Sequence, residues 1–299
     1  HELEAQTEPV AWSEMQSVLR SGLGAHYSGL EIEPEALAAA SLAQVHRACI
    51  VSTGEQIVVK GQYPDLVALL DEDFNTVVKM LRLARWIPGS RDFDSWLTTL
   101  HTQLLAEVDY PREQRMAQAM ADGLSRHAAL QQSPVTIRVP QFWPELCAAD
   151  VLTMEHVEGH RAASLAIAAL PQATRDELGK AMLQLFFAEV FDLGLVQTDP
   201  NFGNYLINND GSELTLLDFG SVFELDQTVR TAVCDTIVAG LINSEIRLER
   251  ALVALGCLKP DAGESAKATF KAFISNLLEP LRPPETLPPE HLNAEGLYC

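Results

Sequence analysis

The amino-acid sequence predicts an α+β fold in two lobes, with strands concentrated in the first lobe and helices dominating the second. Two β-rich runs, HRACIV and QIVVK, flank the turn residues Ser52–Glu55 and indicate an antiparallel hairpin. A second hairpin is indicated by YLIN and ELTLLD, which flank Asn209-Asp210-Gly211. Amphipathic patterns of helical period fill much of the remaining chain. We expect an N-terminal lobe over residues 1–157 and a mainly helical C-terminal lobe over residues 158–299, together forming one domain.

The elements of the first lobe follow from local patterns. Residues 1–30 are expected to be mostly helical, and Asp65–Trp86 is an amphipathic helix closed by Pro88-Gly89. A second helical stretch is predicted over Phe93–Leu124, kinked or broken by Pro111. Two strands, VTIRVPQF and VLTMEHVEG, are expected to follow.

The second lobe is predicted to be helical on both sides of its hairpin. Residues 162–196 are expected to form helices. Beyond Glu224, three further segments resemble packed helices: AVCDTIVAGLIN, SEIRLERALVALGCL and KATFKAFISNLLEPL. The proline-rich run PLRPPETLPPEHLN is expected to be irregular and at the surface.

Composition excludes several classes of protein. A net charge of −20 argues against nucleic-acid binding and disfavours simple adhesion to anionic lipid. No apolar run is long enough to span a bilayer, and we see no signal peptide. A chain that begins at His1 is expected to be a fragment or a trimmed product. Scattered cysteines, odd in number and without a C-x-x-C pair, favour reduced thiols over a disulfide framework or zinc site: Cys49, Cys147, Cys234, Cys257 and Cys299.

The run from Leu195 to Glu224 carries the strongest chemical signal. It presents Asp199, Asn204 and then Asp218 within D-F-G. A D-x-x-x-x-N loop, a hairpin and D-F-G are how kinase-like folds assemble phosphoryl-transfer chemistry. One carboxylate orients the nucleophile, while an amide oxygen and a second carboxylate hold Mg²⁺, which prefers oxygen ligands. Alternatively, Asp199 and Asp218 could simply be turn residues, since aspartate is common in turns. The presence of both motifs together favours the kinase-like interpretation.

Lys60 extends this pattern to the first lobe. It follows two valines in the manner of a kinase strand lysine, although a snorkelling lysine would be the default in isolation. In kinase folds a helix glutamate holds such a lysine on the α/β-phosphates. The acids of LLAEVDYPRE, among them Glu107, Asp109 and Glu113, are the candidates, and the order of the motifs implies a bilobal protein-kinase-like fold. The backbone from Glu155 to Val157 is a candidate for reading adenine at the hinge.

Three further runs resemble one family of kinases. Where ordinary protein kinases carry G-x-G-x-x-G, this chain has Ala38-Ala39-Ala40-Ser41, followed by LAQVH. Together with EVDYPRE and QTDPNFGNYL, this run resembles the UbiB family of atypical kinases (the ADCK group, which includes the coenzyme Q proteins). The resemblance covers roughly residues 10–260. Alanine disfavours positive φ, so Ala38–Ser41 cannot fold over phosphates as a glycine loop does.

The resemblance implies residue roles. It selects Glu113 as the partner of Lys60, and it makes Glu107 and Asp109 a family-specific acidic pair that contacts a K-x-G-Q motif on an N-terminal helical extension. No K-x-G-Q is present. Lys60-Gly61-Gln62 resembles it only superficially, because it lies on the predicted strand and not on an N-terminal helix. We expect the extension to have been lost with the true N-terminus. Helices between Lys60 and Glu107 match the family's extra N-lobe helices.

The family implies a Mg²⁺-dependent ATP- or ADP-binding kinase or ATPase that supports ubiquinone biosynthesis. ATP hydrolysis coupled to conformational or lipid-extraction work is favoured over phosphorylation of proteins. Its expected partners are a lipid or quinone precursor and ubiquinone-biosynthesis proteins at a membrane surface. The expected location is cytoplasmic or peripheral at the inner membrane, on the matrix side in a eukaryote.

Two alternatives stay open. A small-molecule kinase of the aminoglycoside or choline type shares the D-x-x-x-x-N and D-x-[DEG] patterns, but the AAAS and EVDYPRE runs argue against it. A nucleotide-binding scaffold without turnover is weakened by the intact set of metal ligands.

Overall fold

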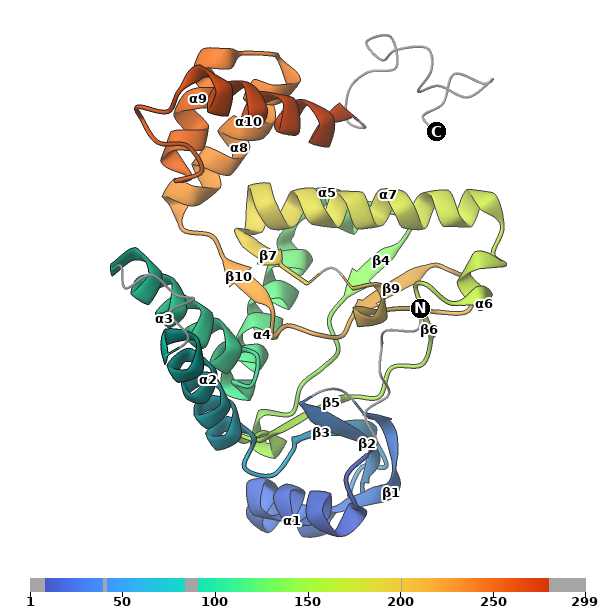
Figure 1. Ribbon diagram of the computed structural model, residues 1–299. Helices are drawn as coiled ribbons and strands as arrows, with labels where there is room; N and C mark the ends of the chain where they lie inside the picture. The colour runs from blue at the N-terminus through green and yellow to red at the C-terminus, as the bar shows by residue number, and fades with distance from the viewer. Residues whose placement is uncertain (1–8, 40–41, 84–90, 200, 280–299) are drawn as a thin grey trace. The chain divides into compact units, whose positions relative to one another are not determined.

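The computed structural model describes residues 9–39, 42–83, 91–199 and 201–279. It confirms the α+β class (Figure 1), and it adds strands that were not predicted, the longest of them over Leu30–Ala39. Two compact units are present: His1–Gln184 with Gln197–Val222, and Leu185–Val196 with Phe223–Cys299. The lobe boundary expected after residue 157 lies inside the first unit and stays a prediction.

A four-stranded antiparallel sheet forms one end of the first unit, in the order β1-β2-β3-β5 (Figure 1). Its strands are β1 (Leu30–Ala39), β2 (Ala43–Ile50), β3 (Gln56–Gln62) and β5 (Val151–Glu155). The predicted β2–β3 hairpin is confirmed, and its turn contains Gly54 at a φ of +76°, which glycine adopts without strain.

Strand β1 contains the first two residues of the run Ala38–Ser41. Ala38 pairs with Val45, and Ala39 pairs with Gln44. These two alanines therefore extend the sheet, while Ala40 and Ser41 lie outside the described residues.

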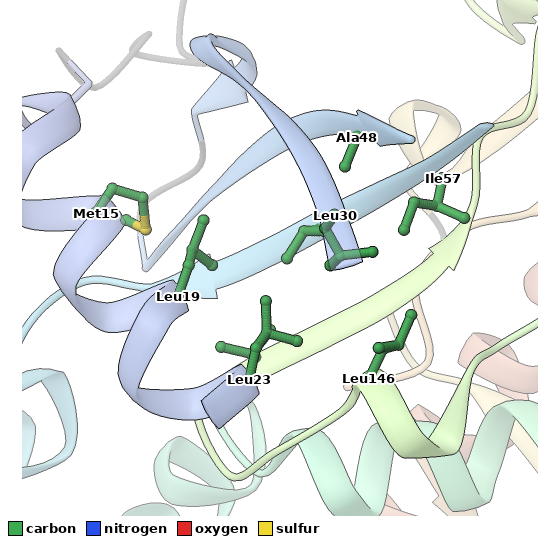
Figure 2. Close-up of a cluster of buried hydrophobic side chains, with 9 residues drawn as sticks. Met15, Leu19, Leu23, Leu30, Ala48, Ile57 and Leu146 are labelled. Atoms are coloured by element: carbon green, nitrogen blue, oxygen red, sulfur yellow. The ribbon is translucent and has the colours of Figure 1, made fainter. Parts of the chain in front are cut away.

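One helix covers a face of this sheet. In α1 (Trp12–Leu23), apolar residues at a spacing of four, Met15, Leu19 and Leu23, are buried against the strands. Figure 2 shows them meeting Leu30, Ala48, Ile57 and Leu146. Burying one such side chain contributes roughly 1.5–3 kcal/mol, so this contact anchors the helix. A 3-10 turn, Gly24–Gly29, leads from α1 into β1.

The helical stretch predicted over Phe93–Leu124 forms two helices, α3 (Arg91–Ala106) and α4 (Tyr110–Arg126). Helix α2 (Leu66–Leu83) precedes them and lies beside α3, and the short α5 (Ala128–Gln131) follows α4 (Figure 1). The interruption precedes Pro111 because Asp109 caps α4 by accepting a hydrogen bond from the backbone N–H of Arg112 at 2.9 Å. Pro111 then occupies the first turn of α4, where no N–H partner is needed.

A second sheet in the first unit has the order β4-β9-β8-β6. Its strands are β4 (Thr136–Arg138), β9 (Glu213–Leu216), β8 (Tyr205–Ile207) and β6 (His160–Arg161). The predicted β8–β9 hairpin is confirmed, with Gly211 in its turn at a φ of +77°. Both strands predicted before it are shorter than expected. β4 ends before Pro140, which has no N–H for a ladder, and β5 ends at Glu155.

The elements up to residue 224 not yet described are short, apart from one long helix. They are the 3-10 turn Pro144–Leu146, α6 (Leu165–Ala168), α7 (Gln172–Ala188), the π-helical turn Glu189–Leu193, β7 (Leu195–Gln197), the 3-10 turn Phe202–Asn204 and β10 (Val222–Glu224). Helix was predicted through residue 196, but Gly194 adopts a left-handed φ of +68° and ends it.

After Glu224 the described residues form three helices, as predicted: α8 (Gln227–Leu241), α9 (Glu245–Ala254) and α10 (Glu264–Leu277). Buried apolar side chains from these helices, together with Leu258 and Leu278 beside them, form a core cluster. A Cβ on Gly240 would lie 2.4 Å from Leu278 Cδ1, so the absence of a side chain permits close packing. The proline-rich run at 280–293 lies outside the described residues. Among the described helices, none combines the length and apolar character required to cross a membrane.

Candidate active site

A buried ion pair joins the first sheet to helix α4. Lys60 Nζ, on β3, lies 3.1 Å from each carboxylate oxygen of Glu113, on α4. The Glu113 side chain is 1% exposed and that of Lys60 is 20% exposed. The contact expected between these two residues is therefore present, 53 residues apart in sequence.

Burial and neighbouring charges shift the pKa values of both groups. Burial lowers the pKa of Lys60, but Glu113, Tyr110 and Asp218 together outweigh this effect, so the pKa of Lys60 is raised. Burial also raises the pKa of Glu113. The contact of both its oxygens with one ammonium is nevertheless the geometry of an ion pair. The ring of Tyr110 adds a cation–π contact, with its centroid 5.1 Å from Lys60 Nζ.

Asp218 follows strand β9 and is fixed by its own backbone. Its Oδ1 accepts a hydrogen bond from Gly220 N–H at 2.9 Å. The next residue, Phe219, is 1% exposed, and its N–H donates to Glu113. The same glutamate therefore contacts both the strand lysine and the D-F-G backbone.

Gln197 ties the Asp199 loop to Asp218. Its Nε2 donates to the carbonyl of Asp218 at 2.8 Å, and its Oε1 accepts from the backbone N–H of Asp199 at 3.2 Å. Sequence reasoning did not assign a role to Gln197. Its place immediately before Thr-Asp within QTDPN was the available signal.

Asn204 lies in a 3-10 turn at the end of the same loop. Its N–H donates to the carbonyl of Asn201 at 2.9 Å, and its carbonyl accepts from Leu217 N–H at 2.9 Å. The second bond connects Asn204 to the residue that precedes Asp218. All three polar residues of the predicted D-x-x-x-x-N and D-F-G motifs are thus connected through a few hydrogen bonds.

Two adjoining cavities collect the predicted residues. One of about 660 Å³ is lined by residues that include Ala38, Lys60, Glu155, Val157, Asn204 and Asp218. The other, of about 280 Å³, is lined by residues that include Lys60, Glu107, Tyr110, Asp199 and Asp218. Since Lys60 and Asp218 line both, the cavities meet at these two side chains.

Two predicted residues have partners within the fold. The carboxylate of Asp109 caps α4. Glu155 accepts two hydrogen bonds from Arg138, at 2.8 and 3.1 Å, and Arg138 also donates to Glu213 at 2.9 Å. The N–H groups of Glu155 and His156 are bonded to Gln141 and Gln56, so the carbonyls of this segment and Val157 are left to consider for a base.

The polar groups around the cavities suit a metal-bound phosphate. Asn204, with a side-chain amide, and Asp218, with a carboxylate, line one cavity that Lys60 also lines. Among the described residues, no cluster of three or more His, Cys, Asp or Glu is arranged to hold a metal alone. A cation held here could complete its coordination with oxygens of water or of a ligand.

Two further observations favour a bound cation and ligand at this site. Burial and the charges of Asp218 and Asp199 raise the pKa of Glu107, so a bound cation would relieve the crowding of these carboxylates. The hydroxyl of Tyr110 is buried without a hydrogen-bond partner. A buried hydroxyl left unpaired is costly, which favours a ligand group close to it.

Comparison with known proteins decides the family. The ABC1 atypical kinase-like domain matches residues 2–250. The chain belongs to the ABC1 atypical kinase-like family. This confirms the resemblance to UbiB proteins that AAAS, EVDYPRE and QTDPN indicated.

Relatives of this ABC1-family chain include two COQ8 proteins. The mitochondrial atypical kinase COQ8 of Schizosaccharomyces pombe is 30% identical over 249 residues, which cover 82% of this chain and 39% of the relative. The mitochondrial atypical kinase COQ8B of Danio rerio is 34% identical over 216 residues, covering 71% and 32%. The chain thus spans only 39% and 32% of the lengths of these relatives.

A solved structure confirms the kinase-like fold. Rv3197 from Mycobacterium tuberculosis, determined as a complex with erythromycin, superposes with a TM-score of 0.70 at 25% identity. The match covers 91% of this chain and 67% of Rv3197.

Proposed function

We propose that this ABC1-family chain binds ATP or ADP together with Mg²⁺ and catalyses phosphoryl transfer or ATP hydrolysis. The observation that carries the proposal is the convergence of a buried Lys60–Glu113 pair and Asp218 on adjoining cavities. Family members named atypical kinases support it.

Each residue has a role in this proposal. Lys60, held by Glu113, binds the α/β-phosphates, and Asn204 and Asp218 would hold Mg²⁺. The metal, when bound, neutralises charge on the phosphate oxygens. Asp199 orients a hydroxyl or water as the nucleophile. The adenine end of the nucleotide lies toward Ala38 and Glu155–Val157, where the larger cavity extends.

The biological role is the wider part of the proposal. We infer that the protein supports ubiquinone biosynthesis, working on a lipid or quinone precursor with ubiquinone-biosynthesis proteins at a membrane surface. The similarity to mitochondrial COQ8 proteins supports this role and a location on the matrix side of the inner membrane in a eukaryote.

Phosphate release with and without Mg²⁺ tests the chemistry. Asp218→Asn is expected to lower Mg²⁺-dependent release by roughly a hundredfold, the loss typical when a group that stabilises transition-state charge is removed. Asp210→Asn is the matched control, because Asp210 lies in the turn of the same β8–β9 hairpin and bonds Ser212. It should retain release.

The other outcomes identify the alternatives. Nucleotide binding by calorimetry without any release by the wild type would favour a scaffold. Release only when an amino sugar or choline is added would favour a small-molecule kinase. Absence of nucleotide binding would overturn the proposal.

A further inference from the structure

The five carbonyls from Asp218 to Val222 are all hydrogen-bonded, although the segment forms a regular ladder only at its end. Three donors come from Gln197 and Thr198: Gln197 Nε2 to Asp218 O at 2.8 Å, and Thr198 N–H and Oγ1 to Ser221 O at 3.1 and 2.6 Å. Phe219 O accepts from Val222 N–H at 3.2 Å. The metal-ligand segment is therefore held along its length by surrounding groups.

Arg112 supplies the remaining donors. Its Nη1 donates to Gly220 O at 2.8 Å, and its Nη2 donates to Val222 O at 2.5 Å. A guanidinium is suited to this contact because its rigid fork directs two N–H groups in parallel. The single ammonium of a lysine lacks that fork.

The base of this arginine is itself fixed. The Arg112 backbone N–H bonds the capping carboxylate of Asp109, so its Cα lies in the well-defined first turn of α4. The next residue on α4 is Glu113, which bonds Lys60 and Phe219 N–H. Two consecutive residues of one helix thus hold the D-F-G segment, one through carbonyls and the other through an N–H.

We propose that Arg112 is a positioning residue that fastens the Asp218–Val222 segment to helix α4. Through this contact, Asp218 keeps its place relative to the Lys60–Glu113 pair. The proposal rests on the proposed function for the role of Asp218 as a metal ligand, while the fastening itself does not depend on it.

Hydrogen–deuterium exchange of the full chain, without nucleotide, tests the fastening. In Arg112→Ala, the amides of residues 219–222 should exchange roughly tenfold or more faster, since two charge-assisted hydrogen bonds are lost. Arg112→Lys should show a smaller acceleration. Arg115→Ala is the matched control, because Arg115 is exposed on the same helix. It should leave these amides unchanged.

A Mg²⁺ titration of nucleotide binding tests the consequence. In Arg112→Ala, half-maximal binding should require roughly tenfold more Mg²⁺, while nucleotide affinity in the absence of Mg²⁺ should stay within about twofold. A purely destabilising change would weaken both.

Each result decides the proposal. Unchanged exchange at 219–222 in both Arg112 variants would overturn it, and so would an unchanged Mg²⁺ requirement in a wild-type protein that binds nucleotide. If the alanine variant is unfolded, the lysine variant carries both comparisons. If the wild type binds no nucleotide, the proposed function fails, and the exchange data still decide whether Arg112 fastens the segment.

Discussion

Replacing Glu113 by glutamine is expected to lower the free energy of unfolding of the first compact unit by about 3 kcal/mol. At the observed 3.1 Å, two unit charges attract by about 5 kcal/mol for an effective dielectric constant near 20. Removing one partner of a buried pair costs about 3–5 kcal/mol, because the other charge remains buried and uncompensated. The lower value applies here because the Lys60 side chain is 20% exposed and water recovers part of the loss.

A double-mutant cycle isolates the pair. Lys60→Met should cost at least as much as Glu113→Gln, since the remaining carboxylate is only 1% exposed. The double variant should cost less than the sum of the two by about 2 kcal/mol. Urea unfolding followed by tryptophan fluorescence reports on the first compact unit, because all four tryptophans fall within residues 1–184. Additivity within about 0.5 kcal/mol would refute a coupled buried pair.

Two further predictions concern the scaffold. Gly159→Ala should lower the free energy of unfolding by about 1–3 kcal/mol, because the added Cβ would lie 2.8 Å from the Ile207 carbonyl oxygen. Gly29→Ala should leave that free energy nearly unchanged, because the space around Gly29 is open. Equal losses for the two variants in urea unfolding would contradict this prediction. Burial lowers the pKa of His46 below its ordinary 6.5, and the neutral ring accepts from Gln44. The unfolded chain therefore protonates first, so unfolding free energy should fall as pH drops below about 6.5, and His46→Gln should flatten that slope between about pH 7 and 5; parallel slopes would count against it.

The parts of the fold set by local residues could be predicted from the sequence. Both hairpins depend on neighbouring turn residues, and Gly54 and Gly211 occupy their turns as positive-φ residues. The interruption of the long helix was placed at Pro111, but the capping hydrogen bond of Asp109 sets it two residues earlier. Local composition indicated that a break exists, and side-chain geometry determined where.

The site could be predicted only in part. Kinase motifs indicated Lys60, Asp199 and Asp218, but the spacing of LLAEVDYPRE did not distinguish among its acids, and family resemblance was needed to choose Glu113. The contacts of Arg112 and Gln197 were not predictable, because each joins a side chain to backbone groups of a distant segment. Such bonds depend on how closely the tertiary structure brings those segments together.

The arginine between Glu155 and Glu213 has a consequence for ligand entry. Glu155 ends a strand of the first sheet, and Glu213 begins a strand of the second. Because Arg138 bonds both carboxylates, it connects the two sheets beside the larger cavity. Arg138 itself belongs to β4 of the second sheet, so tilting one sheet away from the other would stretch its two hydrogen bonds to Glu155. We therefore expect the Arg138–Glu155 pair to resist widening of the cavity, and salt, which screens such partly exposed charges, to weaken it.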